Sequence, residues 1–224
     1  MSAARAIAII GTGTVLLLTG CSSNAPGVDD PSSAATYTDA EARDVLIDES
    51  GDPIPTLTLA EWYAEASEQA PDTFDPASCR NSVSPVLLYD RDADQVGTIY
   101  RPATIEREYD GATVTAAQFV RVFATDAEAA GFVEAFRADR AACREFEIEG
   151  TRVVQGVIDG DFAVDAVGFT FDVAAPDGST NGALEWMLRD GNLVIALDGV
   201  GASVEVLAPL SHRIAEEYAA RLSE

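Results

Sequence analysis

The stretch Thr113-Val-Thr-Ala-Ala-Gln-Phe-Val-Arg-Val-Phe123 alternates along its length, and a helical pattern follows it through Ala124 and Thr125 to Cys143. Alternation is typical of a β-strand with one buried face. Thr125-Asp-Ala-Glu128 matches a capping box, in which a hydroxyl and a carboxylate three residues later start a helix. The helix carries an apolar stripe of Ala129, Phe132, Val133 and Phe136. These patterns predict a strand-turn-helix unit that buries both apolar faces together.

The neighbouring sequence predicts a largely antiparallel sheet. Asp110-Gly111 is a hairpin-type turn, so Thr104–Tyr109 is expected to pair with Thr113–Phe123, and Asp190-Gly191 is a second such turn. Pro102 interrupts the strand pattern of Gly97–Glu108, which favours an edge strand or a bulge. Further strands are expected at Val86–Tyr89, Glu145–Glu149, Arg152–Ile158, Asp165–Val173, Leu184–Leu188 and Leu193–Leu197.

Additional helices are predicted before and after these strands in the sequence. Thr38-Asp-Ala-Glu41 is a capping box before a short helix to about Glu49, and Thr58-Leu-Ala-Glu61 is another. Pro209 is expected to start the last helix. One face of that helix carries Leu210, Ile214, Tyr218 and Leu222. The predicted fold is a single α+β domain with a twisted sheet covered by helices.

Two segments have the residue types of ligand sites. Trp62 and Tyr63 could stack on a ligand, but their helical spacing favours a place in the core. Asp90-Arg-Asp-Ala-Asp94 places carboxylates at alternate positions, as a calcium loop does. Gln95 stands where that loop needs glycine, and Arg101 where it needs a bidentate acid. A solvated turn is therefore expected there.

The amino terminus has the pattern of a secretory signal. Met1–Gly20 carries one early charge, Arg5, followed by an apolar run that is too short to cross a membrane. Leu18-Thr-Gly-Cys21 resembles the bacterial lipobox. This resemblance implies cleavage before Cys21 and a diacylglycerol thioether on its sulfur; the alternative is an ordinary secreted protein. Several acyl chains, palmitate among them, would anchor the protein to the outer face of the cell membrane.

The segment after the lipidation site is rich in Ser, Pro, Gly, Ala and Asp, the composition of a flexible tether. The predicted organisation is a signal peptide at 1–20, a tether at 21–36 and one α+β domain at 37–224. With Cys21 lipidated, Cys79 and Cys143 remain in a compartment that permits disulfides, so one bridge is expected. Metal binding is the weaker alternative, since His212 alone does not complete a zinc site.

Charge limits the classes of partner. All 14 basic residues are arginine, and 38 acidic residues give a net charge of -24. A surface of this sign repels phosphate, so no nucleic-acid partner is expected. The acidic excess is typical of a solvated surface.

The segment Gln118-Phe-Val-Arg-Val-Phe-Ala-Thr-Asp-Ala-Glu-Ala-Ala-Gly-Phe132 resembles the extracytoplasmic sensor domain of actinobacterial receptor serine/threonine kinases and its stand-alone lipoprotein relatives. That family has a strand with glutamine, a closing phenylalanine, an alanine-rich helix and a cysteine at the helix end. Asp75-Pro-Ala-Ser-Cys79 is similar to the cysteine turn that pairs with it. Gly191-Asn-Leu-Val-Ile195 and Ile214-Ala215 are similar to the last strand and helix. The resemblance covers most of Thr38–Leu222.

Two departures from the family pattern stand out. Arg140 occupies the position of a tryptophan that usually lies three residues before the helix-end cysteine. The second disulfide of the family has no counterpart, because the nearest positions are Ala183 and Val200. Both changes weaken the transfer of function from the family to this chain.

Sequence motifs for catalysis are absent or weak. Ser211 and His212 are adjacent in a predicted helix, where neighbours point in different directions, so they do not form a dyad by spacing alone. Gly11-Thr-Gly13 and Gly199-Val-Gly201 lack the context of nucleotide-binding loops. No cofactor and no metal are expected.

The first hypothesis is a non-catalytic, membrane-tethered binding or sensor-like module of the cell envelope, with a small molecule or envelope component in a groove between sheet and helices. Gln118 is the main groove candidate, because it places an amide on an apolar strand face; the alternative is a core amide bonded to backbone. Arg107 and Trp186 are further candidates. The second hypothesis is a scaffold lipoprotein that holds an envelope protein through its acidic face. The third is a hydrolase of unknown specificity.

Overall fold

The predicted strand-turn-helix unit is present as β5 (Ala112–Val122) and α4 (Asp126–Ala142). The Thr125 hydroxyl accepts the Glu128 N–H at 3.2 Å, and the Glu128 carboxylate accepts the Thr125 N–H at 3.1 Å. These two bonds form the predicted capping box and satisfy donors at the helix start. Cys143 caps the other end of α4, as expected.

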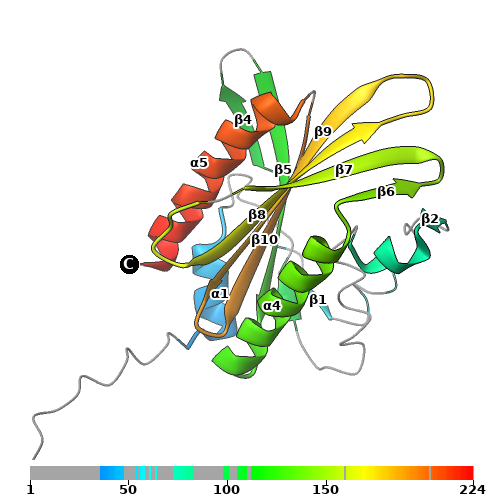
Figure 1. The fold of residues 1–224 in the computed structure, drawn as a ribbon. Helices are drawn as coiled ribbons and strands as arrows, with labels where there is room; N and C mark the ends of the chain where they lie inside the picture. The colour runs from blue at the N-terminus through cyan, green and yellow to red at the C-terminus, as the bar shows by residue number, and fades with distance from the viewer. Residues whose placement is uncertain are drawn as a thin grey trace, which may run out of the picture. The chain divides into compact units, whose positions relative to one another are not determined.

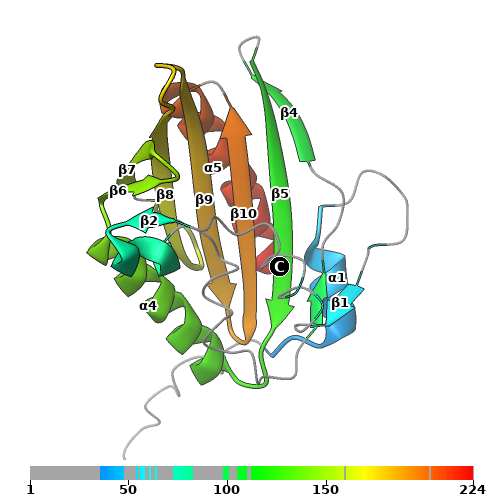
Figure 2. The ribbon, with the colours of Figure 1, turned by 90° about the vertical axis from the view of Figure 1, so that its right-hand side faces the viewer.

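This computed structural model describes residues 36–47, 54, 56–58, 61, 64, 73–82, 98–100, 105–109, 112–158, 160–201 and 203–223. Ten strands within these ranges form one sheet in the order β1-β3-β5-β10-β9-β8-β7-β6-β2, and β4 also pairs with β5. Every pairing is antiparallel. Figure 2 shows the central strands side by side. The strands other than β5 are β1 (Thr56–Thr58), β2 (Phe74–Asp75), β3 (Thr98–Tyr100), β4 (Ile105–Tyr109), β6 (Glu145–Ile148), β7 (Thr151–Ile158), β8 (Asp165–Ala174), β9 (Thr180–Asp190) and β10 (Leu193–Gly201).

The strand expected at Gly97–Glu108 is two strands, β3 and β4, on either side of Pro102. Both pair with β5: Tyr100 lies opposite Val120, and Ile105 lies opposite Ala116. Pro102 itself lies outside the described residues. Tyr109 pairs with Ala112, as the predicted hairpin requires.

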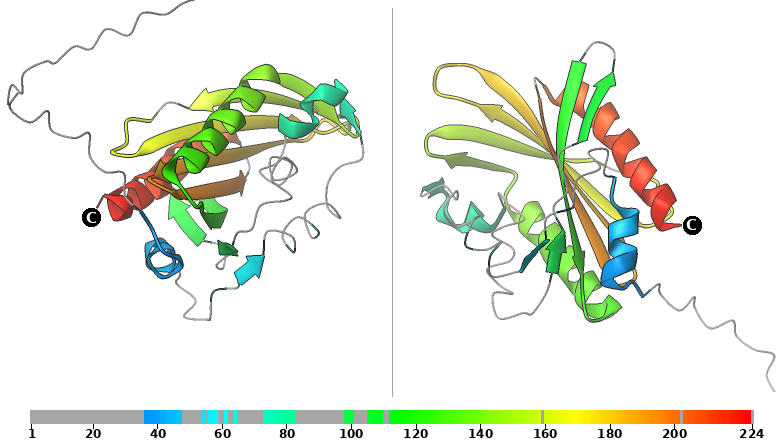
Figure 3. Two further views of the ribbon diagram at one scale, coloured as in Figure 1. Left: turned by 90° about the horizontal axis from the view of Figure 1, so that it is seen from below. Right: turned by 180° about the vertical axis from the view of Figure 1, so that it is seen from behind.

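Helices cover the two faces of the sheet. α1 (Asp39–Val45) and α5 (Val204–Leu222) lie on one face, and α4 lies on the other (Figures 1 and 3). The face under α1 and α5 buries one apolar cluster, whose strand members include Val120, Leu188 and Ile195. The face under α4 buries a second cluster of mainly aromatic and valine side chains. The predicted α+β fold is confirmed.

The short 3-10 helix η1 (Ala77–Ser82) is linked to the end of α4 by a disulfide between Cys79 and Cys143. Both cysteines are buried, and their Cα atoms are 5.5 Å apart. The bridge confirms the pairing expected from the cysteine count.

Two helix boundaries differ from the sequence-based expectation. α1 has the predicted capping box at Thr38 and Glu41 but ends at Val45, before Glu49. α5 begins at Val204 with Pro209 inside it, so the prediction of a helix start at Pro209 was wrong. The earlier turn is held by packing, because Leu207 is fully buried beside Leu184 and Leu210. This burial offsets the backbone hydrogen bond that a proline inside a helix removes.

Several predicted features lie outside the described residues. These are Cys21 and the signal and tether up to residue 35, Trp62 and Tyr63, the strand at Val86–Tyr89, and the Asp90–Asp94 turn. The capping box that precedes Trp62 is present, with Thr58 N–H donating to the Glu61 carboxylate at 2.8 Å. Among the described helices, none combines the length and apolarity that crossing a bilayer requires.

Candidate functional site

A pocket of about 460 Å³ lies beside the C-terminal end of α4. Figure 1 shows α4 leading into β6, with the far halves of β7 and β9 extending beyond the helix. Among the described residues that line the pocket, most have apolar side chains and five have polar ones. The apolar lining consists of Phe146, Ile148, Val153, Phe171, Val173, Ala183, Leu184 and Val200; the polar lining consists of Arg140, Glu149, Thr151, Glu185 and Asp198. Volume and lining match those of small-molecule sites.

Strand register brings the floor of this pocket together. Glu185 of β9 lies directly opposite Asp198 of β10, and Ala183 lies opposite Val200. On the other side of β9, Phe171 of β8 is the partner of Ala183. Since side chains on a strand alternate between faces, these residues form two adjacent rows on one face of the sheet.

Arg140, in the last turn of α4, reaches down onto this floor. Its guanidinium forms an ion pair with Glu185, and the exposed fractions of the two residues are only 1% and 2%. The guanidinium carbon lies 4.9 Å from the ring centres of Phe136 and Phe171, so aromatic faces also contact the charge. Gln155 donates to the Arg140 carbonyl at 2.8 Å and holds the helix end against β7.

The ion pair leaves polar atoms unsatisfied. Arg140 Nε and Nη1 and Glu185 Oε1 are buried and have no hydrogen-bond partner in the described part of the chain. A buried polar atom without a partner costs about 1–3 kcal/mol. A molecule in the pocket that supplies these partners would therefore gain binding free energy.

Asp198 adds a second carboxylate beside the pair. Burial raises the pKa of Asp198 well above its usual range; the charge of Glu185 acts in the same direction and Arg140 opposes them. Burial also raises the pKa of Glu185, against the attraction of Arg140. Burial is the largest cause of the raised pKa of both carboxyls, because a region with little water disfavours their charged form. Perturbed pKa values in a cleft are typical of functional sites.

The structure places Gln118 and Trp186 elsewhere. Both are fully buried under α1 and α5, on the sheet face opposite the pocket, and neither lines it. Arg107 lies in β4 opposite Val114, and its side chain is outside the described part. Neither Gln118 nor Trp186 is therefore placed at this pocket, and the prediction for Arg107 stays untested.

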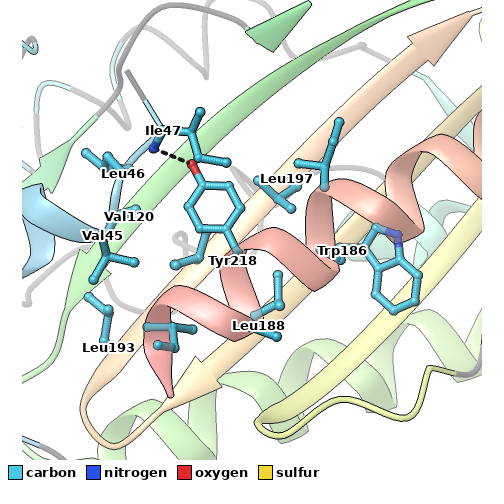
Figure 4. Close-up of a cluster of buried hydrophobic side chains, with 14 of the residues drawn as sticks. Val45, Leu46, Ile47, Val120, Trp186, Leu188, Leu193, Leu197 and Tyr218 are labelled. Carbon is cyan, nitrogen blue, oxygen red and sulfur yellow. Dashed lines mark hydrogen bonds between the residues drawn. The ribbon is translucent and has the colours of Figure 1, made fainter. Parts of the chain in front are cut away.

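Gln118 and Trp186 have partners in the core. The Gln118 amide donates to the Ile47 carbonyl at 2.5 Å, and the Trp186 indole N–H donates to the Ser211 hydroxyl at 3.0 Å. The Ile47 N–H in turn donates to the Tyr218 hydroxyl at 3.1 Å, which ties the segment after α1 to α5 (Figure 4). This placement favours the alternative reading of Gln118 as a core amide. Its assignment to a ligand site stays an untested prediction.

Sequence reasoning missed the pocket residues, although each carried a signal. Arg140 falls one helical turn after Phe136, so it interrupts the apolar stripe of α4. Glu185 and Asp198 interrupt apolar strands in the same way. Ala183 and Val200, the positions that the sequence resemblance matched to a second disulfide, are cross-strand partners. Within the described ranges, no three His, Cys, Asp or Glu side chains are grouped to hold a metal ion.

Comparisons with known proteins identify the fold. No protein-family model matches the chain, and no curated protein matches its sequence. Among solved structures, the chain is similar to the extracellular domain of PknH from Mycobacterium tuberculosis, with a TM-score of 0.53 and 13% sequence identity. The similarity covers 85% of this chain and 98% of that domain. The chain therefore has the fold of the PknH extracellular domain, in agreement with the resemblance in its sequence.

Proposed function

We propose that this chain is a non-catalytic, sensor-like binding module of the cell envelope, whose ligand binds in the pocket at the end of α4. The observation that carries the proposal is the buried Arg140–Glu185 pair, which lines the pocket and has donor and acceptor atoms without a hydrogen-bond partner among the described residues. Groups of this kind are costly to keep in a core that serves packing alone. A ligand that completes their hydrogen bonds accounts for their presence.

An extracytoplasmic location is supported by three independent features. The fold is that of a domain described as extracellular. The Cys79–Cys143 disulfide fits an oxidising compartment. Leu18-Thr-Gly-Cys21 fits lipidation of Cys21, followed by a tether to residue 36 and the domain at 37–224. The protein would then be anchored to the outer face of the membrane.

Binding is tested by thermal unfolding of the protein with small-molecule and lipid fractions of the cell envelope. A fraction that contains the ligand is expected to raise Tm, because a ligand stabilises the folded state that it binds. The matched variant is Val200→Trp, which fills the pocket from an exposed position that is 63% accessible. Its Tm without ligand is the control for folding. A shift of the same size in this variant would place the ligand elsewhere.

The anchor is tested separately with an alkyne-labelled palmitate fed to cells that produce the protein. Label and membrane association are expected in the wild type and absent in Cys21→Ser. Label that persists in Cys21→Ser would contradict lipidation at this residue.

Hydrolysis is a second candidate function, favoured by one observation. Glu185 and Asp198 place two carboxylates with raised pKa values side by side in a pocket, and a protonated carboxyl is what general acid catalysis needs. Turnover of a glycoside, ester or peptide that is lost in Asp198→Asn would replace the binding proposal with an enzymatic one.

A further inference from the structure

The described residues around the pocket floor include more acidic than basic side chains. α4 contributes Arg140, β9 contributes Glu185, β10 contributes Asp198, and the turn between β6 and β7 contributes Glu149. The β5 partners of Asp198 and Val200 are Ala117 and Thr115, which carry no charge. Among the described residues that line the pocket, three carry a carboxylate when ionised and one carries a guanidinium.

The unsatisfied atoms differ in how well the protein compensates them. The Arg140 guanidinium is contacted by the faces of Phe136, Phe169 and Phe171, with its carbon 4.9 to 5.9 Å from the ring centres. Aromatic faces are partly negative and offset the missing partners of a cation. Glu185 Oε1 has no hydrogen-bond donor within the described ranges, and the residue is 2% exposed. The site therefore lacks a donor more than it lacks an acceptor.

The rest of the pocket suits an apolar body. Its walls include Phe146, Ile148, Val153 and Val173, and its volume of about 460 Å³ holds a molecule well above the size of a metal ion. A second anion beside Glu185 and Asp198 would be repelled, whereas a cation would reduce the repulsion between them. The protein's net charge of -24 also attracts cations from solution.

From these observations, and resting on the proposed function, we infer that the pocket selects a cationic amphiphile: an apolar chain or ring that carries a protonated amine. The ammonium group lies between Glu185 and Asp198 and donates to Glu185 Oε1. The apolar part lies along the strands toward Phe146 and Val200.

Three probes with one eight-carbon chain test this inference: octylamine, 1-octanol and octanoate. Affinities for the purified full chain are measured below the aggregation concentration of each probe by isothermal titration calorimetry, with thermal unfolding as a second readout. Octylamine is expected to bind about tenfold or more tightly than octanol, the range of a charge-assisted hydrogen bond. Octanoate is expected to bind most weakly.

Two variants test whether the preference for octylamine comes from the pocket floor. Asp198→Asn is expected to lower the preference for octylamine over octanol about tenfold. Asp172→Asn is the matched control, because it makes the same charge change at an exposed β8 position outside this pocket, and it is expected to leave the preference unchanged. Octylamine binding is also expected to release protons, since a cation favours ionised Asp198; titrations in buffers with different ionisation enthalpies measure this.

The results separate this inference from the proposed function. If octanol or octanoate binds as well as octylamine, and Val200→Trp abolishes that binding, the pocket binds ligands but the cationic selectivity is wrong. If Val200→Trp leaves octylamine binding intact, the ligand site is not this pocket and both fail. If none of the three probes binds the wild type, the inference is rejected, and the Tm shift with envelope fractions decides the proposed function separately.

Discussion

Glu185 and Asp198 lie directly opposite one another on adjacent antiparallel strands, on the same face of the sheet and beside a pocket. Like charges in this relationship destabilise a sheet. Arg140, which carries the guanidinium among the described residues of the pocket floor, pairs with Glu185 and not with Asp198 in the described part of the chain. The pocket floor therefore keeps a local electrostatic cost in the folded protein.

Asp198→Asn is expected to stabilise the protein at neutral pH. The pKa of Asp198 is raised in the folded state, so the folded protein holds this proton to a higher pH than the unfolded chain does. Stability therefore falls as pH rises from the usual Asp range, about 4, to the raised pKa. The variant removes this loss, and a gain of about 1 kcal/mol corresponds to about 2–4 °C in Tm at pH 7.

Thermal unfolding at pH 7 and at about pH 3 measures the effect, with Asp172→Asn as the exposed control. The gain is expected to vanish at the acidic pH, where the carboxyl is protonated in both states. An equal gain at both pH values would show that its cause is not ionisation.

Arg140→Met is expected to destabilise the protein by about 3–5 kcal/mol, because it leaves the buried Glu185 charge without its partner. The double variant Arg140→Met/Glu185→Leu replaces the pair with apolar side chains. Its free energy of unfolding is expected to lie within about 2 kcal/mol of the wild type. Urea unfolding of the two single variants and the double variant gives the coupling energy; strictly additive losses would contradict this account.

Gln118→Leu tests the residue that the sequence singled out. The change leaves the buried Ile47 carbonyl without its donor and is expected to cost about 1–3 kcal/mol of stability, with no effect on octylamine affinity. Gln155→Leu is the matched variant, since it also removes an amide donor to a carbonyl, that of Arg140. Its stability loss is expected to be similar, and it is expected to weaken octylamine binding as well. Weaker binding in Gln118→Leu would return this residue to the ligand site.

Cys79→Ala/Cys143→Ala is expected to lower the free energy of unfolding by about 4 kcal/mol, from the loop entropy of 64 residues of separation. Urea unfolding of the double variant measures the loss. The wild type with a reducing agent is expected to behave in the same way. If reduction leaves the wild-type transition unchanged while free thiols are detected, the disulfide does not contribute to stability.

The local helices and hairpins could be predicted from the sequence. The capping boxes at Thr38 and Thr125 and the turns at Asp110 and Asp190 each act within a few residues, so their patterns predict where helices and hairpins begin. The two-residue turn between Asp190 and Leu193 also fixes the register that sets Glu185 opposite Asp198. The pairing of these two residues was predictable in principle, but it was not singled out because the sequence contains many acidic residues.

Two positions show where local rules are insufficient. Pro209 was expected to start α5, but burial of Leu207 extends the helix before it. Gln118 was a groove candidate because it interrupts an apolar face, yet α1 and α5 close over that face and Ile47 provides its partner. In both cases long-range packing outweighs the local pattern.

The sequence by itself determined the strand-helix unit, the antiparallel pairings next to its turns, and the pairing of Cys79 with Cys143. These depend on short-range periodicity, turn geometry and cysteine count. Only the tertiary structure decided which interrupted apolar pattern forms a site. Arg140 meets Glu185 and Asp198 because α4 packs across β9 and β10 and its last turn lies at the pocket, where those strands extend beyond it. That contact depends on how long-range apolar surfaces pack, which no local stretch of the chain specifies.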